Sequence, residues 1–146
     1  MAEPRYSQRD PRNRDDYSPP PAAQIARFIT EDGSAAAMVD CAEQLGAHLK
    51  NTNVTTSQIR NAYGNMKKLE MAGWQGSRTQ REVILLKPRL AYAVGRQKGS
   101  TQTGLRSLQT VLNSAIDAPV NDAETFKRFC QFFEAIVAYH KAAGGS

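Results

Sequence analysis

Residues 121–145 read NDAETFKRFCQFFEAIVAYHKAAGG, a stretch in which large apolar side chains recur every three or four positions. This spacing places them on one face of an α-helix, because a helix completes a turn in about 3.6 residues. Asn121 and Glu124 stand at capping-box spacing before the apolar run, and Gly144 with Gly145 follows it. The stretch therefore predicts a long amphipathic helix with one face in a hydrophobic core.

The predicted core face of this helix comprises Phe126, Phe129, Cys130, Phe133, Ile136, Val137 and His140. Phe132 and Tyr139 flank that face and widen its apolar arc. We expect both to pack in the core. Contact with a second protein along the Phe132 and Tyr139 edge is the alternative.

Helical periodicity extends back from this stretch to residue 23, and no segment alternates apolar and polar residues long enough to predict a strand. We expect helices over about 23–30, 35–50, 57–72, 77–98 and 103–117, in addition to the last one. Ser34 and one of the residues 55–57 are the expected N-caps of the second and third. Gly73 and Pro119 are expected to end the third and fifth. The predicted fold class is all-α, a compact bundle of five to six helices.

Residues 1–22 differ from the rest of the chain in composition. They hold five of the seven prolines and, after Met1, no aliphatic side chain larger than alanine. Such a segment cannot bury enough apolar surface to offset the entropy of ordering its backbone. We therefore expect a disordered tail over 1–22 and one helical domain over 23–146, a size that supports a substantial core.

The sequence offers no catalytic or metal-binding motif. His48 and His140 have no cysteine or second histidine at ligand spacing, and no phosphate-binding glycine loop or nucleophile elbow is present. We therefore expect no enzymatic activity, no metal and no cofactor. Cys41 and Cys130 stand among apolar neighbours and are expected to be buried free thiols in a reducing compartment. No apolar run is long enough to span a membrane, so a cytoplasmic protein is predicted.

Basic charge is concentrated in the middle of the chain. Residues 50–106 carry eleven Lys or Arg against two acids, a net charge of +9, whereas 1–49 sum to −3 and 107–146 to −1. Charge gathered in one region is typical of proteins that bind polyanions, and nucleic acid is the leading partner class. A solvated basic face is the competing interpretation.

Four arginines of the region expected to be helical over 77–98 fall on one side of a helical wheel, and Tyr92 lies among them. They are Arg78, Arg81, Arg89 and Arg96. The opposite side carries the apolar residues Val83, Leu86, Leu90, Ala91 and Val94. This helix can bury one face and present the other to phosphates, while the Tyr92 ring stacks on a base or on an arginine.

Pro88 interrupts this row of four arginines. It removes a helical hydrogen bond, so it either kinks the helix or begins a second one. The alignment of the arginines is therefore predicted only within each half of the region, before and after Pro88. On the preceding helix Arg60 and Lys67 share a face with Lys68 beside them, and these three extend the predicted basic surface over a helix pair.

Residues 40–72 also permit a helix-turn-helix interpretation. In it, 42–49 form the support helix and 56–66 the recognition helix, with Gln58, Arg60 and Asn61 reaching base edges. The break from Lys50 to Thr56 is longer than the usual turn, which weakens the interpretation. A DNA-binding transcription regulator is therefore the alternative function, and an adaptor that binds only protein is a third.

Three stretches carry a family resemblance. TTSQIRNAY (55–63), LLKPRLAYAVGR (85–96) and FFEAIVAYHKAAGG (132–145), in this order and spacing, resemble the small helical subunit of type III-A CRISPR interference complexes, the Csm complexes. The resemblance covers roughly residues 24–145, leaves the tail outside, and agrees with the basic charge and the double glycine.

This resemblance implies an all-α, non-catalytic subunit that stacks in several copies along crRNA and its target RNA. Its implied partners are the backbone and large subunits, to which target cleavage, DNA cleavage and cyclic-oligoadenylate synthesis belong. The basic surface of the family would map onto Arg60 and the Arg89–Arg96 half of the second stretch. The contributions of Arg78, Arg81, Lys67 and Lys68 rest on charge alone.

Overall fold

The structure is a computed structural model that describes residues 17–146 and, within them, contains helices and no strand. Its elements are α1 (Ala22–Thr30), the 3₁₀ turn η2 (Asp32–Ser34), α2 (Ala35–Asn51), α3 (Thr56–Ala72), α4 (Ser77–Ile84), α5 (Leu86–Gly95), α6 (Gly99–Ile116) and α7 (Ala123–Ala142). The all-α prediction is confirmed. Most of the predicted tail, residues 1–16, lies outside the described residues.

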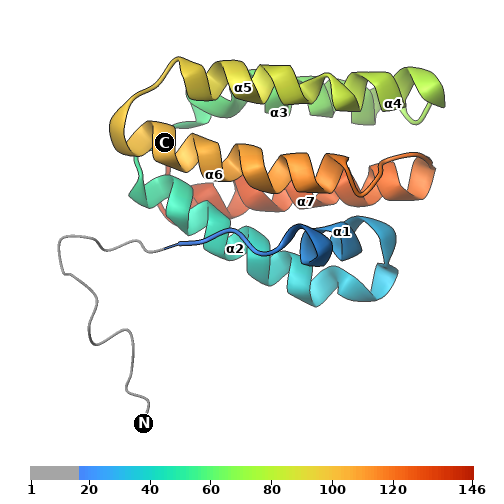
Figure 1. The fold of residues 1–146 in the computed structure, drawn as a ribbon, viewed down its shortest axis with the longest axis horizontal. Helices are drawn as coiled ribbons and strands as arrows, with labels where there is room; N and C mark the ends of the chain where they lie inside the picture. The colour runs from blue at the N-terminus through green and yellow to red at the C-terminus, as the bar shows by residue number, and fades with distance from the viewer. Residues whose placement is uncertain (1–16) are drawn as a thin grey trace, which may run out of the picture.

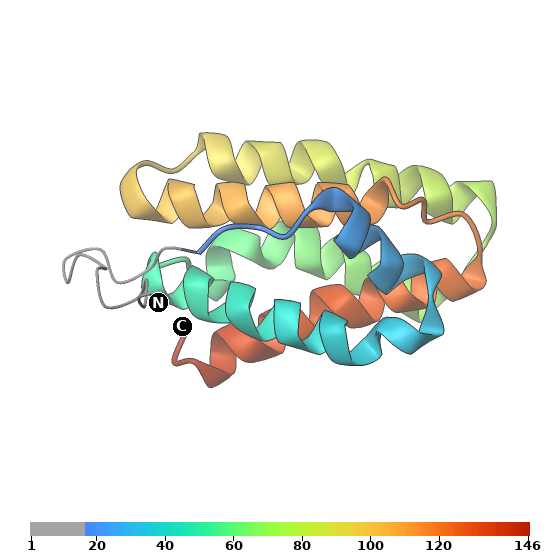
Figure 2. The same ribbon diagram turned by 60° about the horizontal axis from the view of Figure 1, so that its bottom comes forward.

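Helices α6 and α7 form the middle of the bundle. Figure 1 shows α3, α4 and α5 along one side of this central pair and α1 with α2 along the other. The pairs α2–α7, α1–α6 and α5–α6 make the most extensive interhelical contacts, and α3 packs on both α5 and α7. The turned view in Figure 2 shows α1 crossing the bundle beside α6. Helices α3, α4 and α5, which carry most of the predicted basic surface, therefore lie on one side of the molecule.

The helix expected over 77–98 is divided at Leu85 into α4 and α5. Pro88 is the third residue of α5, where its missing N–H costs no intrahelical hydrogen bond. Leu85 itself keeps right-handed helical angles, and its N–H donates to the Arg81 carbonyl at 3.0 Å. The two helices consequently follow one another along the same edge of the bundle (Figure 1). Of the two options that Pro88 left open, the structure has a second helix, beginning two residues before the proline.

One predicted cap is confirmed in position and another is off by one residue. Ser34 is the N-cap residue of α2, but its hydroxyl donates to the Glu31 carbonyl at 2.6 Å and makes no capping bond to the helix. The cap of α7 is Asp122, one residue after the predicted Asn121. The Asp122 carboxylate accepts from the Thr125 N–H at 2.8 Å, and the Thr125 hydroxyl accepts from the Asp122 N–H at 3.1 Å. The capping box therefore pairs Asp122 with Thr125, one residue later than the predicted pair of Asn121 and Glu124.

The predicted face of α7 lies in the core, where Phe129 and Phe133 are fully buried and Val137 is half-buried, and the flanking Phe132 is fully buried as well. Phe132 meets Phe28 of α1 edge-on with ring centroids 5.3 Å apart, and Phe133 meets Tyr63 of α3 in the same way at 5.4 Å. Tyr139 is half-buried against the core. The core interpretation of Phe132 is therefore confirmed.

Both histidines and both cysteines pack inside the bundle. The His140 ring Nε2 lies 2.6 Å from the Val54 carbonyl oxygen, and the His48 Nε2 lies 3.0 Å from the Ser107 hydroxyl. Tyr17, ahead of α1, stacks on the His48 ring with centroids 4.5 Å apart. Cys41 and Cys130 are buried free thiols, as predicted.

Candidate nucleic-acid interface

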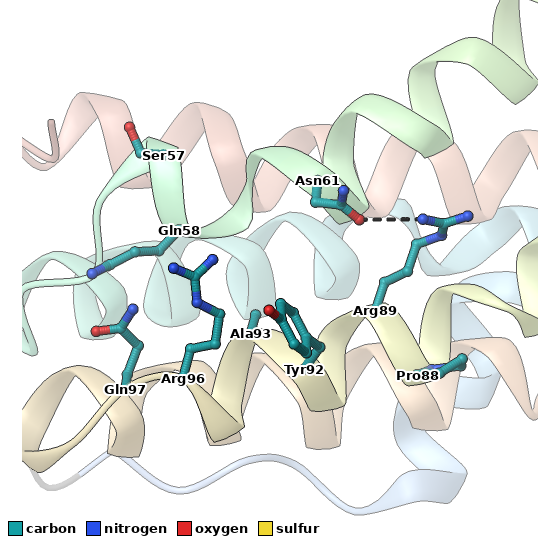
Figure 3. A pocket seen from close by; sticks show the side chains of 9 residues that line it. All are labelled: Ser57, Gln58, Asn61, Pro88, Arg89, Tyr92, Ala93, Arg96 and Gln97. Atoms are coloured by element: carbon teal, nitrogen blue, oxygen red, sulfur yellow. Dashed lines mark hydrogen bonds between the residues drawn. The ribbon is translucent and has the colours of Figure 1, made fainter.

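A cleft of about 580 Å³ opens between α3 and α5. It is lined by Ser57, Gln58 and Asn61 of α3, by Pro88, Arg89, Tyr92 and Ala93 of α5, and by Arg96 and Gln97 just after α5. Figure 3 shows Arg89 and Arg96 rising from the α5 side toward α3, with Tyr92 between them. Leu86, Leu90 and Val94 are buried on the opposite side of α5. The amphipathic pattern of this helix thus places the arginines in the cleft.

Two contacts position the arginines of the cleft. The guanidinium carbon of Arg96 lies 5.6 Å from the centroid of the Tyr92 ring, a cation–π contact. Arg89 donates from Nη1 to the Asn61 side-chain oxygen over a long 3.4 Å. Tyr92 nevertheless remains 68% exposed. The cleft therefore presents two guanidinium groups and an aromatic ring to solvent.

A second hollow, of about 320 Å³, adjoins the cleft between α3 and α4. Lys68 and Arg78 line it, and so does Arg89, which also lines the cleft. Glu82 contributes one carboxylate to this hollow. Arg89 lines both depressions, and we call the two together the basic groove.

Lys67 lies away from this groove. Its ammonium bonds to Glu70 of the same helix at 2.8 Å and to Glu134 of α7. These carboxylates, Glu134 first, raise the pKa of Lys67 well above its usual range. The charge of Lys67 is thus already matched by acids of the protein.

The remaining predicted site residues, Arg60 and Arg81, are exposed on α3 and α4 but line neither hollow. Lys87 of α5 bonds to Asp117 at 2.5 Å. Within residues 17–146 no carboxylate lies within 4 Å of the charged groups of Arg60, Lys68, Arg78, Arg81, Arg89 or Arg96. For six of the seven predicted basic residues, the described part of the chain thus supplies no matching acid.

Four polar residues of the cleft were not predicted as part of this surface: Ser57, Gln58, Asn61 and Gln97. Gln58 and Asn61 were predicted only as base-reading residues of the helix-turn-helix alternative. Their spacing from Ser57 marks one face of α3, but the sequence does not show that this face lies opposite α5. Tertiary packing supplies that information.

The packing of α2 and α3 does not favour the helix-turn-helix interpretation. Helix α2 packs chiefly on α7, whereas α3 packs on α5 and α7. Gln58 and Asn61 line the cleft beside α5. The supposed recognition helix therefore turns part of its polar face toward another helix of the same bundle.

The described part of the chain shows no group of three His, Cys, Asp or Glu side chains that could hold a metal ion. None of the helices in residues 17–146 is both long and apolar enough to cross a membrane.

Comparison with known proteins identifies a family. The sequence model of the family described as Csm2 Type III-A matches residues 32–146. No curated protein matches the chain in sequence. The matched residues include α2 to α7 and thus the whole basic groove.

Proposed function

The chain belongs to the Csm2 Type III-A family, the small subunits of type III-A CRISPR Csm complexes, and we propose that it binds the RNA of such a complex along the groove of α3, α4 and α5. In this proposal the RNA is the crRNA, its target, or both. The backbone and large subunits are the protein partners, and further copies of the chain stack beside it. The setting is the cytoplasm.

The observation that supports RNA binding best is the arrangement of Arg89, Tyr92 and Arg96 in one cleft. Guanidinium groups bind phosphate oxygens through two parallel hydrogen bonds, and they are well suited to this when no acid competes for them. Arg78 and Lys68 continue the positive charge into the neighbouring hollow. Such a groove follows a nucleic-acid backbone without reading its sequence, so base pairing by the guide would supply specificity.

We assign the protein a scaffolding role without catalysis of its own. The family is one of small non-catalytic subunits. The described residues contain no cluster of side chains that could hold a metal ion, and both histidines make hydrogen bonds inside the bundle. Chemistry would then reside in the other subunits, while this chain holds the RNA.

The test is the salt dependence of RNA binding by the full chain. For single strands, the logarithm of the association constant falls by about 0.7 per tenfold rise in salt for each neutralised phosphate. The double variant Arg89→Ala with Arg96→Ala should weaken binding to unrelated RNAs equally and flatten the slope by roughly one to one and a half units.

A matched control removes two positive charges elsewhere. Arg27 on α1 and Lys127 on α7 are exposed and line neither hollow of the groove. Their double alanine variant should keep the wild-type slope. Equal slopes for both double variants would exclude the groove as the RNA site. Selective binding of one duplex DNA sequence, relaxed by Arg60→Ala, would contradict the proposal as a whole.

A further inference from the structure

Tyr92 is the single exposed aromatic side chain in residues 17–146. The ten aromatic residues of that range include five phenylalanines, all buried, while Tyr17, Tyr63, Trp74 and Tyr139 are half-buried. Aromatic rings gain much of their stabilising effect from burial, and Tyr92 forgoes it at 68% exposure. Residues 17–146 therefore present one aromatic ring to solvent, and it lies in the middle of the basic cleft.

Two arginines flank the Tyr92 ring in the cleft. Arg96 and Arg89 flank it, with a spacing of seven residues that corresponds to two helical turns, or about 10 Å along α5. The first contacts the ring and the second is tied to Asn61. In Figure 3 the ring stands between the two guanidinium groups and below α3. Two guanidinium groups thus flank one exposed aromatic ring.

The opposite wall of the cleft offers hydrogen-bond donors. The Gln58 side-chain oxygen accepts from the Thr55 N–H at 2.7 Å, and the Asn61 oxygen accepts from Arg89. Because each amide oxygen is engaged, the two NH₂ groups remain as donors. Every nucleobase carries acceptors on its edge, so such donors hold any base without selecting one.

We propose that the cleft between α3 and α5 takes up one unpaired nucleobase, which stacks on Tyr92 while Arg89 and Arg96 bind the phosphates on either side. This inference rests on the proposed function and refines it from a phosphate groove to a groove with a base pocket. The volume of about 580 Å³ is within the usual range of small-molecule sites. An unpaired base enters at the least cost, because no pairing has to be broken.

The experiment uses the full chain and a single-stranded oligouridine of about 12 nucleotides, within the usual site size of single-strand binders. One probe carries fluorescent 2-aminopurine at its centre, and a second carries an abasic nucleotide there. The variants are Tyr92→Phe, which keeps a ring, and Tyr92→Leu and Tyr92→Ala, which do not. Circular dichroism melts confirm that these exposed-site variants fold.

Wild type and Tyr92→Phe should quench the fluorescence on binding. Tyr92→Leu and Tyr92→Ala should lose the quenching and bind roughly 5- to 150-fold more weakly, the range for removing one stacked base, with the salt slope unchanged. The abasic probe should bind wild type as weakly as it binds these two variants.

Two other results overturn the pocket in distinguishable ways. If Tyr92→Leu binds and quenches like wild type while the Arg89 and Arg96 variants still flatten the salt slope, the base pocket is wrong and the phosphate groove stands. If wild type binds neither probe, both the pocket and the proposed RNA binding are wrong.

Discussion

Lys67 of α3 and Glu134 of α7 form an ion pair that joins the two helices, and Glu70 binds the same ammonium at 2.8 Å. The next residue, Lys68, is exposed and lines the basic groove beside Arg78. One step along α3 turns a side chain by about 100°, which suffices to move it from one helix interface to the other. Two adjacent lysines of the sequence therefore differ in their surroundings.

We predict opposite effects for Lys67→Met and Lys68→Met. Lys67→Met should lower the melting temperature, because it leaves Glu134 and Glu70 close together without a cation, and should leave the salt slope of RNA binding unchanged. Lys68→Met should keep the melting temperature and flatten the slope. Thermal melts and RNA titrations of the same two proteins measure both effects. A flattened slope for Lys67→Met would instead place that residue on the RNA.

The pH dependence of this contact follows from the direction of its pKa shift. Folding raises the pKa of Lys67. The stabilisation of the folded protein by the ion pairs of Lys67 is therefore fully present below the ordinary lysine pKa, and it is lost only as the pH rises through the higher pKa of Lys67 in the folded protein. The difference in melting temperature between wild type and Lys67→Met should therefore be the same at pH 7 and pH 9. A difference that disappears by pH 9 would contradict this assignment.

Gly46 sets the distance between α2 and α7. A Cβ atom at this position would lie 2.6 Å from the His140 backbone nitrogen and 2.7 Å from the Tyr139 backbone. Backbone cannot yield as a side chain does, so Gly46→Ala should force the helices apart and destabilise the protein by about 1–3 kcal/mol. Urea denaturation should show a lower midpoint with the same m-value.

Gly64 in α3 provides the matched control, since nothing lies within 4 Å of a Cβ built there. Gly64→Ala should stabilise the protein by about 0.5–1 kcal/mol, because alanine loses less backbone entropy in a helix than glycine. Destabilisation of similar size at both positions would mean that the close approach of α2 and α7 is not what matters at Gly46.

Most of the fold could be predicted from the sequence, because each helix carries its own apolar period. The spacing of the phenylalanines was enough to predict the buried face of α7, and Gly73 and Pro119 predicted the ends of α3 and α6. The start of α6 was harder to place. It begins at Gly99, four residues before the predicted start, and its first hydroxyls, Ser100 and Thr101, bond to the Thr52 carbonyl. That carbonyl belongs to a distant part of the chain, so the sequence around Gly99 does not predict these bonds.

The candidate site was predictable along one helix and not between helices. The wheel of 77–98 placed Arg89, Tyr92 and Arg96 together, and the structure brings them into one cleft. The opposite wall comes from α3, and a helical wheel does not show which face of α3 meets α5. The same limit applies to Lys67, since its partner Glu134 is 67 residues away.

Asp122 should make the start of α7 sensitive to acid. Hydrogen bonds from Thr125 lower the pKa of Asp122. The stabilisation of the folded protein by the Asp122 carboxylate is therefore present above the ordinary carboxyl pKa, and it is lost as the pH falls through the lower pKa of Asp122 in the folded protein. Asp122→Asn keeps an acceptor at the cap and removes the charge. Melting temperatures of wild type and Asp122→Asn should differ most at neutral pH and converge near pH 2. A constant difference would show that the charge plays no part.

The two thiols should be inert in the native protein. Burial raises the pKa of Cys41 to about 11 and that of Cys130 to about 12, and for Cys130 the carboxylates of Glu70 and Glu134 act in the same direction. Thiolate, the reactive form, is then scarce at pH 8. An aromatic disulfide reagent should modify the native protein at least about 100-fold more slowly than the chain in denaturant, where thiols regain an ordinary pKa near 8.5. Rapid modification of one thiol in native protein would indicate that α2 or α7 opens locally, and Gly46→Ala, which separates these helices, should accelerate the reaction of both.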